Sequence, residues 1–221
     1  MLKECIIEKF LDNEERENII IGSERNINSS VLVLFCEFEG KVNILFEKRA
    51  ESISQGGEVS FPGGVKEKRD KVSMETALRE TFEEIGIKPE RIKRKRKYGT
   101  LVIPTGVIIQ VNIGYIDNFS FDELDINKDE VDKVFLVPLE YFMKNKPIVE
   151  KVMVENIPSF NKNGKNINFP AKELGLPSIY CEPWGKERRV FLYPYEGEMI
   201  WGITGEIVDS ICKNIQKIIE M

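Results

Sequence analysis

The chain has 221 residues, 42% of them hydrophobic and 31% charged, values typical of a globular protein with one sizeable core. It contains no histidine, which excludes Ser-His-Asp and Cys-His catalysis, histidine metal sites and histidine general bases. The formal net charge of −5 gives no general reason to expect nucleic acid as a partner. Any hydrolytic chemistry must therefore use carboxylates, lysine, tyrosine or a metal ion bound by oxygen.

The cysteines and the apolar segments indicate in which cellular compartment the protein is expected. No two of the four cysteines form a C-x-x-C pair, and Cys36 and Cys212 lie in apolar patterns, so buried thiols are predicted rather than a zinc site. No charged-then-apolar signal peptide opens the sequence, and no apolar run approaches the ~18 residues of a membrane span. We therefore expect a cytoplasmic protein with no membrane partner.

The first third of the chain predicts a helix, a loop and a β-hairpin. Apolar residues recur at helical spacing over residues 1–12, and residues 13–30 are mostly polar. A nearly continuous apolar strand is predicted over residues 31–38, paired across a short turn with a second strand over 42–47. Residues 49–57 then read as a loop that leads to a Phe-Pro-Gly-Gly turn, where the backbone of Gly63 and Gly64 can approach a ligand closely.

Residues 73–85 predict an amphipathic helix. At about 100° per residue, three glutamates fall within an arc of roughly 100°, and four apolar side chains lie within roughly 80° on the opposite side. Gly86 follows the helix, and Pro89 blocks its continuation. We therefore expect one buried face and one dense negative face. The negative face comprises Glu80, Glu83 and Glu84, and the apolar face comprises Met74, Leu78, Phe82 and Ile85.

The negative face is a candidate metal site. Like charges three and four residues apart on a helix cost a few tenths of a kcal/mol per pair, and a bound cation would remove that cost. Hard oxygen ligands suit Mg²⁺ or Mn²⁺, which commonly binds one or two carboxylates together with substrate phosphates. We expect the metal on Glu80 and Glu84, with Glu83 assisting, and Arg79 one turn earlier can hold the Glu83 carboxylate in position.

The remaining two thirds of the chain predict further strands and a final helix. The basic run over residues 91–97 is interpreted as a solvated strand edge rather than a phosphate or nucleic-acid site. The acidic loop over 118–132 is ordinary solvation or the source of a further acid, with Glu130 as the first candidate. Other strands are expected over 107–116, 131–137, 149–154 and 189–195, a short helix over 139–144, a long connection over 156–186, and a C-terminal helix that ends near residue 220.

The segment that ends in Arg79-Glu80-Thr81-Phe82-Glu83-Glu84-Ile85-Gly86-Ile87 resembles the Nudix box. That pattern is a glycine, five residues, a glutamate, seven residues, and then Arg-Glu-U-x-Glu-Glu-x-Gly-U, where U is a bulky aliphatic residue. The spacing from Gly64 to Arg79 is one residue longer than the pattern, Asp70 stands about where the first glutamate belongs, and Thr81 replaces an aliphatic residue.

In these differences from the general pattern, the sequence resembles the coenzyme A pyrophosphatase branch of that family. This branch has a similar extra residue and an upstream signature, which Arg49-Ala50 and residues 57–64 match. Residues 200–204, Ile-Trp-Gly-Ile-Thr, look like its closing motif. Ser54 stands where the signature has an arginine, and the segment is one residue short, which puts one phosphate contact in doubt.

The resemblance implies an α/β fold of the α/β/α sandwich type around a mixed sheet, as a single domain over residues 1–221 with N-terminal and C-terminal helical extensions. It implies a Mg²⁺- or Mn²⁺-dependent pyrophosphohydrolase that acts on a small nucleoside diphosphate derivative, and a homodimer is left open. Coenzyme A or an acyl derivative is the expected substrate, with ADP-ribose, NADH or a non-catalytic binding module as alternatives. The expected catalytic residues are Glu83, Glu84, Arg79 and Glu130, and the expected substrate contacts are Arg49, Gly63 and Gly64.

Overall fold

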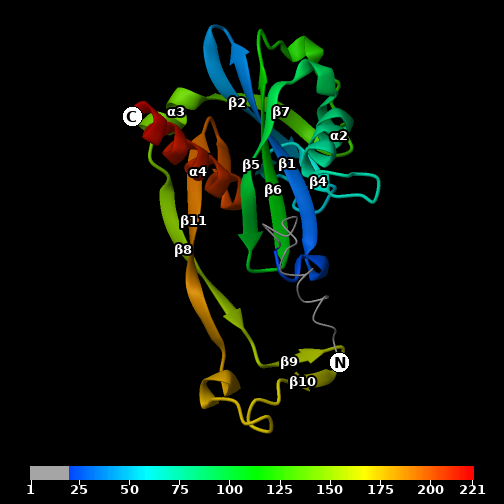
Figure 1. Ribbon diagram of the computed structural model, residues 1–221, viewed down its shortest axis with the longest axis vertical. Coiled ribbons are helices and arrows are strands. Elements are labelled where there is room, and N and C mark those ends of the chain that lie inside the picture. Colours follow the sequence, from blue (N-terminus) through cyan, green and yellow to red (C-terminus); the bar gives the residue numbers. More distant parts are fainter. Residues whose placement is uncertain (1–19) are drawn as a thin grey trace, which may run out of the picture.

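The computed structural model describes residues 20–221, so the helix predicted over residues 1–12 lies outside the described part. Within that part, a seven-stranded mixed β-sheet forms the centre of the molecule (Figure 1). Strand β1 (Ile27–Phe38) runs parallel to β6 (Val107–Ile116) and antiparallel to β2 (Lys41–Arg49). The sheet is completed by β3 (Val59–Ser60) and β7 (Val131–Pro138) beside β2, β4 (Gly63–Val65) beside β1, and β5 (Lys93–Ile103) beside β6.

Helices cover both faces of this sheet. Helix α2 (Ser73–Ile85) lies on one face, and α3 (Leu139–Lys144) and α4 (Gly202–Ile219) lie on the other (Figure 1). The predicted sandwich around a mixed sheet is therefore confirmed, and among the described residues no helix is long and apolar enough to cross a membrane. Short 3-10 turns connect elements at Ser23–Arg25, Pro89–Arg91 and Phe121–Glu123.

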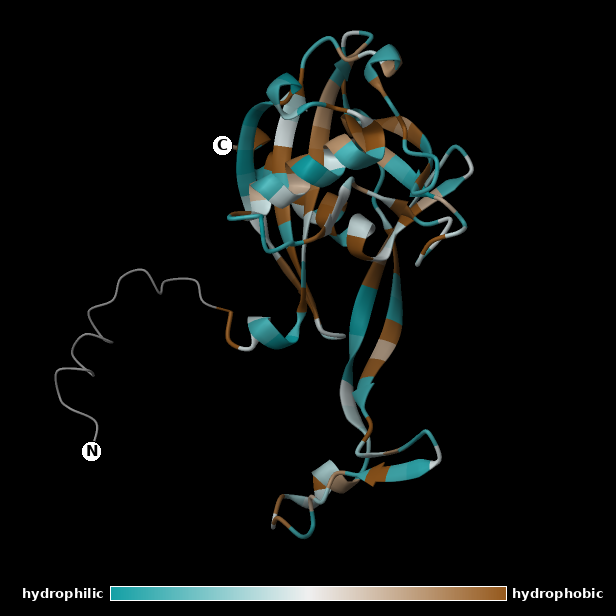
Figure 2. Cartoon of the chain, turned by 90° about the vertical axis from the view of Figure 1, so that its right-hand side faces the viewer, coloured by the Kyte–Doolittle hydropathy of each residue, from teal (hydrophilic) through white to brown (hydrophobic). Residues whose placement is uncertain are grey.

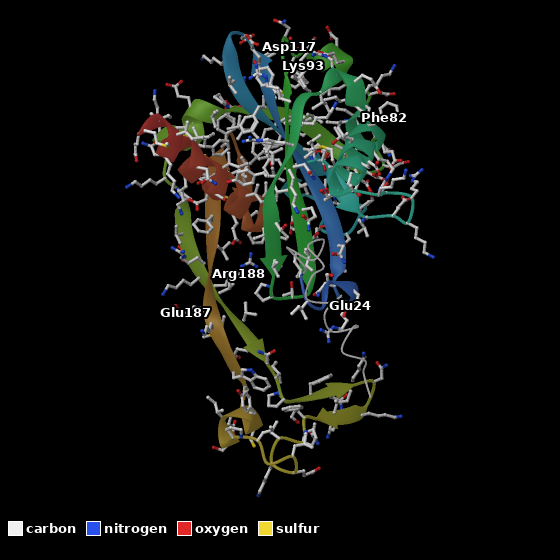
Figure 3. The ribbon with its side chains drawn as sticks, viewed as in Figure 1. Glu24, Phe82, Lys93, Asp117, Glu187 and Arg188 are labelled. Atoms are coloured by element: carbon white, nitrogen blue, oxygen red, sulfur yellow. The ribbon has the colours of Figure 1, made fainter. Side chains whose placement is uncertain are left out.

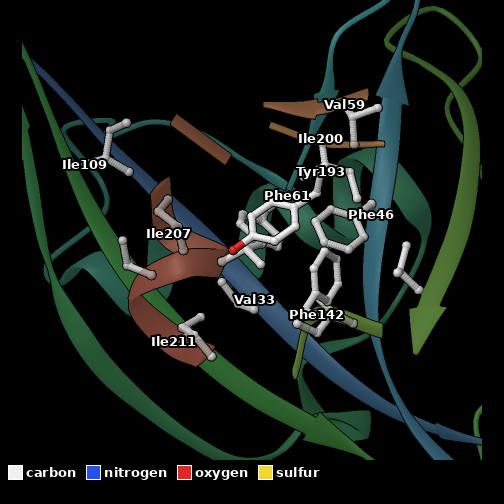
Figure 4. Packing of buried hydrophobic residues seen from close by; sticks show 14 of the residues in the cluster. Val33, Phe46, Val59, Phe61, Ile109, Phe142, Tyr193, Ile200, Ile207 and Ile211 are labelled. Carbon is white, nitrogen blue, oxygen red and sulfur yellow. The ribbon is translucent and has the colours of Figure 1, made fainter. Parts of the chain in front are cut away.

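The two faces of the sheet carry separate apolar cores. Alternate residues of β1 divide between them, with Leu32 and Leu34 packed under α2 and Val33 packed under α4. The core under α4 contains four buried aromatic residues among Val and Ile side chains, and the rings of Phe46 and Phe61 stack with centroids 5.0 Å apart (Figure 4). Because both faces are covered, β1 reads in the sequence as a continuous apolar run.

The edge strand β5 carries the basic run. Its first five residues, Lys93 to Lys97, are exposed, as predicted for a solvated strand edge. At one end of this edge, the Lys93 ammonium lies 2.6 Å from a carboxylate oxygen of Asp117 (Figure 3). Arg91 pairs with the other carboxylate oxygen of Asp117 at 3.0 Å and with Glu123 at 2.5 Å.

A three-stranded sheet of β8 (Ile148–Asn156), β11 (Trp184–Tyr195) and β12 (Glu198–Trp201) lies beside α4. The distal halves of β8 and β11 leave the body as a two-stranded ribbon, which we call the arm, residues 152–188 (Figures 1 and 2). The tip of the arm holds the hairpin of β9 (Ser159–Lys162) and β10 (Lys165–Asn168) and a 3-10 turn at Ser178–Cys181. The arm exposes several apolar side chains, among them Val152, Met153, Phe160 and Ile179.

Candidate active site

Helix α2 follows its predicted boundary but not its predicted faces. It ends at Gly86, whose φ of 77° is left-handed and whose amide donates to the Phe82 carbonyl at 3.0 Å. Glu84 faces the sheet and is only 4% exposed, whereas Phe82 is 47% exposed on the outer side (Figure 3). The expectation that all three glutamates form one outward negative face is therefore wrong. Glu84 turns inward because a backbone donor on β4 is available to its carboxylate.

That donor belongs to the Gly63–Gly64 segment. The amide of Gly63 donates to Oε2 of Glu84 at 2.9 Å, while β4 pairs with β1 on its other side. A Cβ atom on Gly63 would lie 2.3 Å from the Ser30 carbonyl oxygen, and one on Gly64 would lie 2.4 Å from Cδ of Glu80. At Gly63 a side chain would collide with the backbone of β1, whereas at Gly64 it would displace the Glu80 carboxylate. Whether these glycines also contact substrate stays a prediction.

Arg79 is held at the centre of a carboxylate network. Its guanidinium donates to both carboxylate oxygens of Asp70, at 3.3 and 3.0 Å, and lies 2.8 Å from Glu80 and from Glu83. Hydrogen bonds from Arg79, more than any other cause, lower the pKa of Asp70 well below its usual range. Arg79 therefore positions Glu83, as expected, and Asp70 in turn anchors Arg79.

Glu47 on β2 is a site residue that the sequence interpretation missed. Its side chain is 0% exposed, Ser60 donates to its Oε1 at 3.0 Å, and within the described residues its Oε2 has no hydrogen-bond partner. Burial raises the pKa of Glu47, and burial followed by the charge of Glu47 raises the pKa of Glu84. The sequence carried little signal for this burial, because Glu47 follows the apolar run Ile44-Leu45-Phe46 and precedes the charged Lys48-Arg49, as the polar end of a strand would.

Arg49 and Glu130 lie at the rim of this cluster. Arg49 is close enough for its charge to lower the pKa values of Glu47 and Glu84, and Glu130 raises the pKa of Glu47. The Arg49 Nε donates to the carbonyl of Ser54 at 3.2 Å, and the amide of Ala50 donates to the Glu130 carbonyl at 2.9 Å. The residues proposed from the sequence thus gather around one acidic cluster, although their roles stay predictions.

The donor set fits a hard divalent cation. Among residues 20–221, no three histidine, cysteine, aspartate or glutamate side chains are already gathered around one point. Mg²⁺ needs fewer, because it commonly takes one or two carboxylates and completes its shell with water and phosphate oxygens. Glu47 and Glu84 are buried carboxylates, and an oxygen of Glu47 accepts no hydrogen bond from the described residues, so oxygen ligation by a cation would satisfy it.

The comparison with protein families decides which family this architecture represents. A family model of the NUDIX domain matches residues 27–156, more than half of the chain. The chain belongs to the Nudix family. Nudix hydrolase 3 of Caenorhabditis elegans is 30% identical over 213 residues, covering 90% of this chain and 80% of that protein. The resemblance of residues 79–87 to the Nudix box is thereby confirmed.

Two relatives of this Nudix chain are coenzyme A diphosphatases by name. The peroxisomal coenzyme A diphosphatase NUDT7 of Mus musculus is 33% identical over 129 residues, which cover 58% of this chain and 53% of that protein. The mitochondrial coenzyme A diphosphatase NUDT8 of Homo sapiens is 32% identical over 128 residues, which cover 54% and 52%. The matched stretch therefore spans about half the length of these two relatives.

A solved structure shares the Nudix fold over nearly the whole chain. The MutT/nudix family protein from Enterococcus faecalis covers 99% of this chain and 70% of that chain, with a TM-score of 0.50. Its sequence identity is 12%, so this likeness concerns the fold alone.

Proposed function

We propose that this Nudix enzyme is a Mg²⁺- or Mn²⁺-dependent pyrophosphohydrolase that cleaves the diphosphate of a nucleoside diphosphate derivative. The observation that carries the proposal is the buried Glu84, held by the Gly63 amide beside Glu80 and the buried Glu47. Glu80 and Glu84 would hold the cation, with Glu83 assisting. The bound cation would neutralise the diphosphate and lower the pKa of an attacking water.

The protein's own groups divide the remaining work. Arg79 restrains Glu80 and Glu83 by ion pairs of 2.8 Å, so these carboxylates are oriented before substrate arrives. Glu130 has an exposed side chain and a backbone fixed to Ala50, and we assign it the role of taking the proton from the attacking water. Arg49 supplies a guanidinium beside the cluster, which suits a phosphate oxygen of the substrate.

For the substrate, we propose coenzyme A or an acyl derivative, split into phosphopantetheine and adenosine bisphosphate. Arg49-Ala50, residues 57–64 and residues 200–204 support this choice, as do the names of two relatives. Ser54 offers its carbonyl to Arg49 in place of a second guanidinium, so one contact to the extra ribose phosphate is lost. ADP-ribose and NADH remain the alternative substrates, and we retain the cytoplasm as the proposed location.

A substrate panel with and without Mg²⁺, read out by product masses, tests both parts of the proposal. We expect turnover to require Mg²⁺ or Mn²⁺, and full turnover in a chelator would overturn the mechanism. Comparing kcat/KM for coenzyme A, dephospho-coenzyme A, NADH and ADP-ribose decides the substrate, because a clear preference for either of the last two contradicts it. Equal rates on the first two would show that the phosphate contact is absent.

Glu84→Gln tests the assignment of the buried glutamate. The change preserves shape but removes a charged ligand, so we expect the rate to fall by about 100-fold or more, as for loss of one preorganised electrostatic group. The circular dichroism spectrum should be unchanged. Glu37→Gln is the matched control, because Glu37 is a partly buried glutamate that accepts from Tyr115 at 2.9 Å and lies outside the acidic cluster. A variant at residue 84 that retained the wild-type rate would show that Glu84 is no ligand.

A further inference from the structure

We propose that Glu47 on β2 is a direct ligand of the divalent cation, in addition to the glutamates of helix α2. This inference rests on the proposed function, since it concerns the same metal site. It extends that site from the α2 segment to a strand residue that lies outside the box and was not a candidate from the sequence pattern.

The direction of the Glu47 side chain follows from strand alternation. Its neighbour Phe46 points into the core under α4, and so do Val59 and Phe61 on either side of Ser60 (Figure 4). Successive side chains of a strand point to opposite faces, so Glu47 and Ser60 both point to the other face, where α2 lies. The 3.0 Å hydrogen bond between Ser60 Oγ and Glu47 Oε1 agrees with this placement.

That hydrogen bond also fixes which Glu47 oxygen is available. Ser60 occupies Oε1, and Oε2 has no hydrogen-bond partner within the described residues although the side chain is fully buried. A buried carboxylate oxygen without a partner is destabilising, and native proteins retain one chiefly where it has a function or an additional ligand. A hard cation is the ligand that Glu47, the one carboxylate of β2, can share with the glutamates of α2.

Within the described residues, no lysine or arginine forms an ion pair with Glu47 or Glu84. Arg49 lies near enough for its charge to lower the pKa of both carboxyl groups, but its Nε donates to the Ser54 carbonyl. Arg79, the arginine of the box, directs its contacts to Asp70, Glu80 and Glu83, and a longer one to Glu67 at 3.6 Å. Glu84 instead accepts the Gly63 amide through Oε2. The two buried carboxylates therefore form a pair at the inner end of the site, next to Glu80. Like charges that are buried together need an opposite charge, which a bound Mg²⁺ or Mn²⁺ would provide.

Binding of Mn²⁺ in the absence of substrate tests the inference with a readout other than activity. We would titrate the full chain with Mn²⁺ by calorimetry and electron paramagnetic resonance, and record the rise in melting temperature that Mn²⁺ causes. For Glu47→Gln we expect at least tenfold weaker Mn²⁺ binding and a smaller metal-induced rise, because one charged ligand is lost. In a chelator the variant should melt no lower than the wild type, because a buried charge is removed. Ser60→Ala should weaken binding less, and the control Glu37→Gln should not change it.

The outcomes separate this inference from the proposed function. If Glu47→Gln binds Mn²⁺ as tightly as the wild type, Glu47 is not a ligand and the inference fails while the proposed function stands. If the wild type itself binds no Mn²⁺ or Mg²⁺, the proposed function fails, and the inference with it. Should the glutamine variant not fold, Glu47→Ala also removes the carboxylate, and unchanged Mn²⁺ affinity in that variant would equally overturn the inference.

Discussion

Replacing Asp70 with asparagine would measure how strongly the protein anchors Arg79 beside the box glutamates. The Asp70 side chain is 5% exposed and that of Arg79 is 13% exposed. The Asp70 carboxylate accepts two hydrogen bonds from Arg79, one from Thr76 and one from the backbone amide of Glu67. Hydrogen bonds to charged groups contribute about 1.5–3 kcal/mol, and removing one partner of a buried ion pair costs about 3–5 kcal/mol. Because Arg79 retains its other carboxylates, we expect Asp70→Asn to lower the free energy of unfolding by about 2–3 kcal/mol.

The same substitution should have a characteristic pH dependence. Arg79 holds the pKa of Asp70 well below its usual range, so the folded-state pKa lies below the unfolded value of about 3.9. A depressed carboxyl pKa stabilises the folded state fully above the unfolded pKa, and this stabilisation is lost as the pH falls toward the folded pKa. The difference in unfolding free energy between wild type and Asp70→Asn should therefore be constant from pH 6 to 8 and shrink below about pH 4.

Urea denaturation in a chelator, which removes any contribution from metal binding, provides the assay. For a chain of this size, a loss of about 2–3 kcal/mol corresponds to a melting temperature roughly 4–12 °C lower. Asp132→Asn serves as the control, because Asp132 is exposed and should change the unfolding free energy by no more than about 0.5 kcal/mol. Equal midpoints for the two variants at pH 7, or a difference that persists unchanged to pH 3.5, would refute the reasoning.

Gly64→Ala should lower the metal-dependent kcat/KM by roughly tenfold or more, because the new Cβ would lie 2.4 Å from Cδ of Glu80 and would displace the Glu80 carboxylate. An unchanged rate would show that Glu80 needs no precise placement. Iodoacetamide should label the exposed Cys181 in the native protein but not Cys36, because burial raises the pKa of the Cys36 thiol to about 12. Peptide mass spectrometry measures the labelling, and equal labelling of the two cysteines would contradict this prediction. Phe82→Gln should change the melting temperature by only a few degrees, since the ring is half exposed. A large drop would indicate that Phe82 is part of the apolar core.

The α2 helix shows which features of a helix can be predicted from its local sequence. Its C-terminal boundary at Gly86 could be predicted, because a left-handed glycine and a following proline are local signals. The exchange of Glu84 and Phe82 between the faces could not be predicted, since Phe82 lies at one edge of the apolar stripe and Glu84 at one edge of the acidic arc. Their placement depends on where the sheet lies, and on the Gly63 amide, which is 21 residues away in the sequence from Glu84.

Longer-range pairing explains the other differences. The proposed role of Glu47 depends on Ser60 and Glu84, which lie on other elements, and locally Glu47 only begins the charged end of an apolar strand. The β9–β10 hairpin could have been predicted from the sequence, because Asn163-Gly164 is a strong turn signal. In the structure both residues have the positive φ that such a turn requires. The pairing of Trp184 with Asn156 was not predictable from periodicity, because the tip of the arm lies between the two residues.

The arm is a place where the chain can accept insertions and deletions. It leaves the body through one ladder, in which Arg189 pairs with Lys151 just before the ribbon extends beyond the core, and the NUDIX family match ends at residue 156 on the same ribbon. Below that ladder, Phe191 and Tyr193 are buried in the body. Residues added to or removed from the tip therefore change neither the register of β11 in the core nor the position of α4. A shorter chain joined by a two-residue turn beyond Lys151 and Arg189 would preserve the same body, which makes the ribbon a natural place for insertion and deletion.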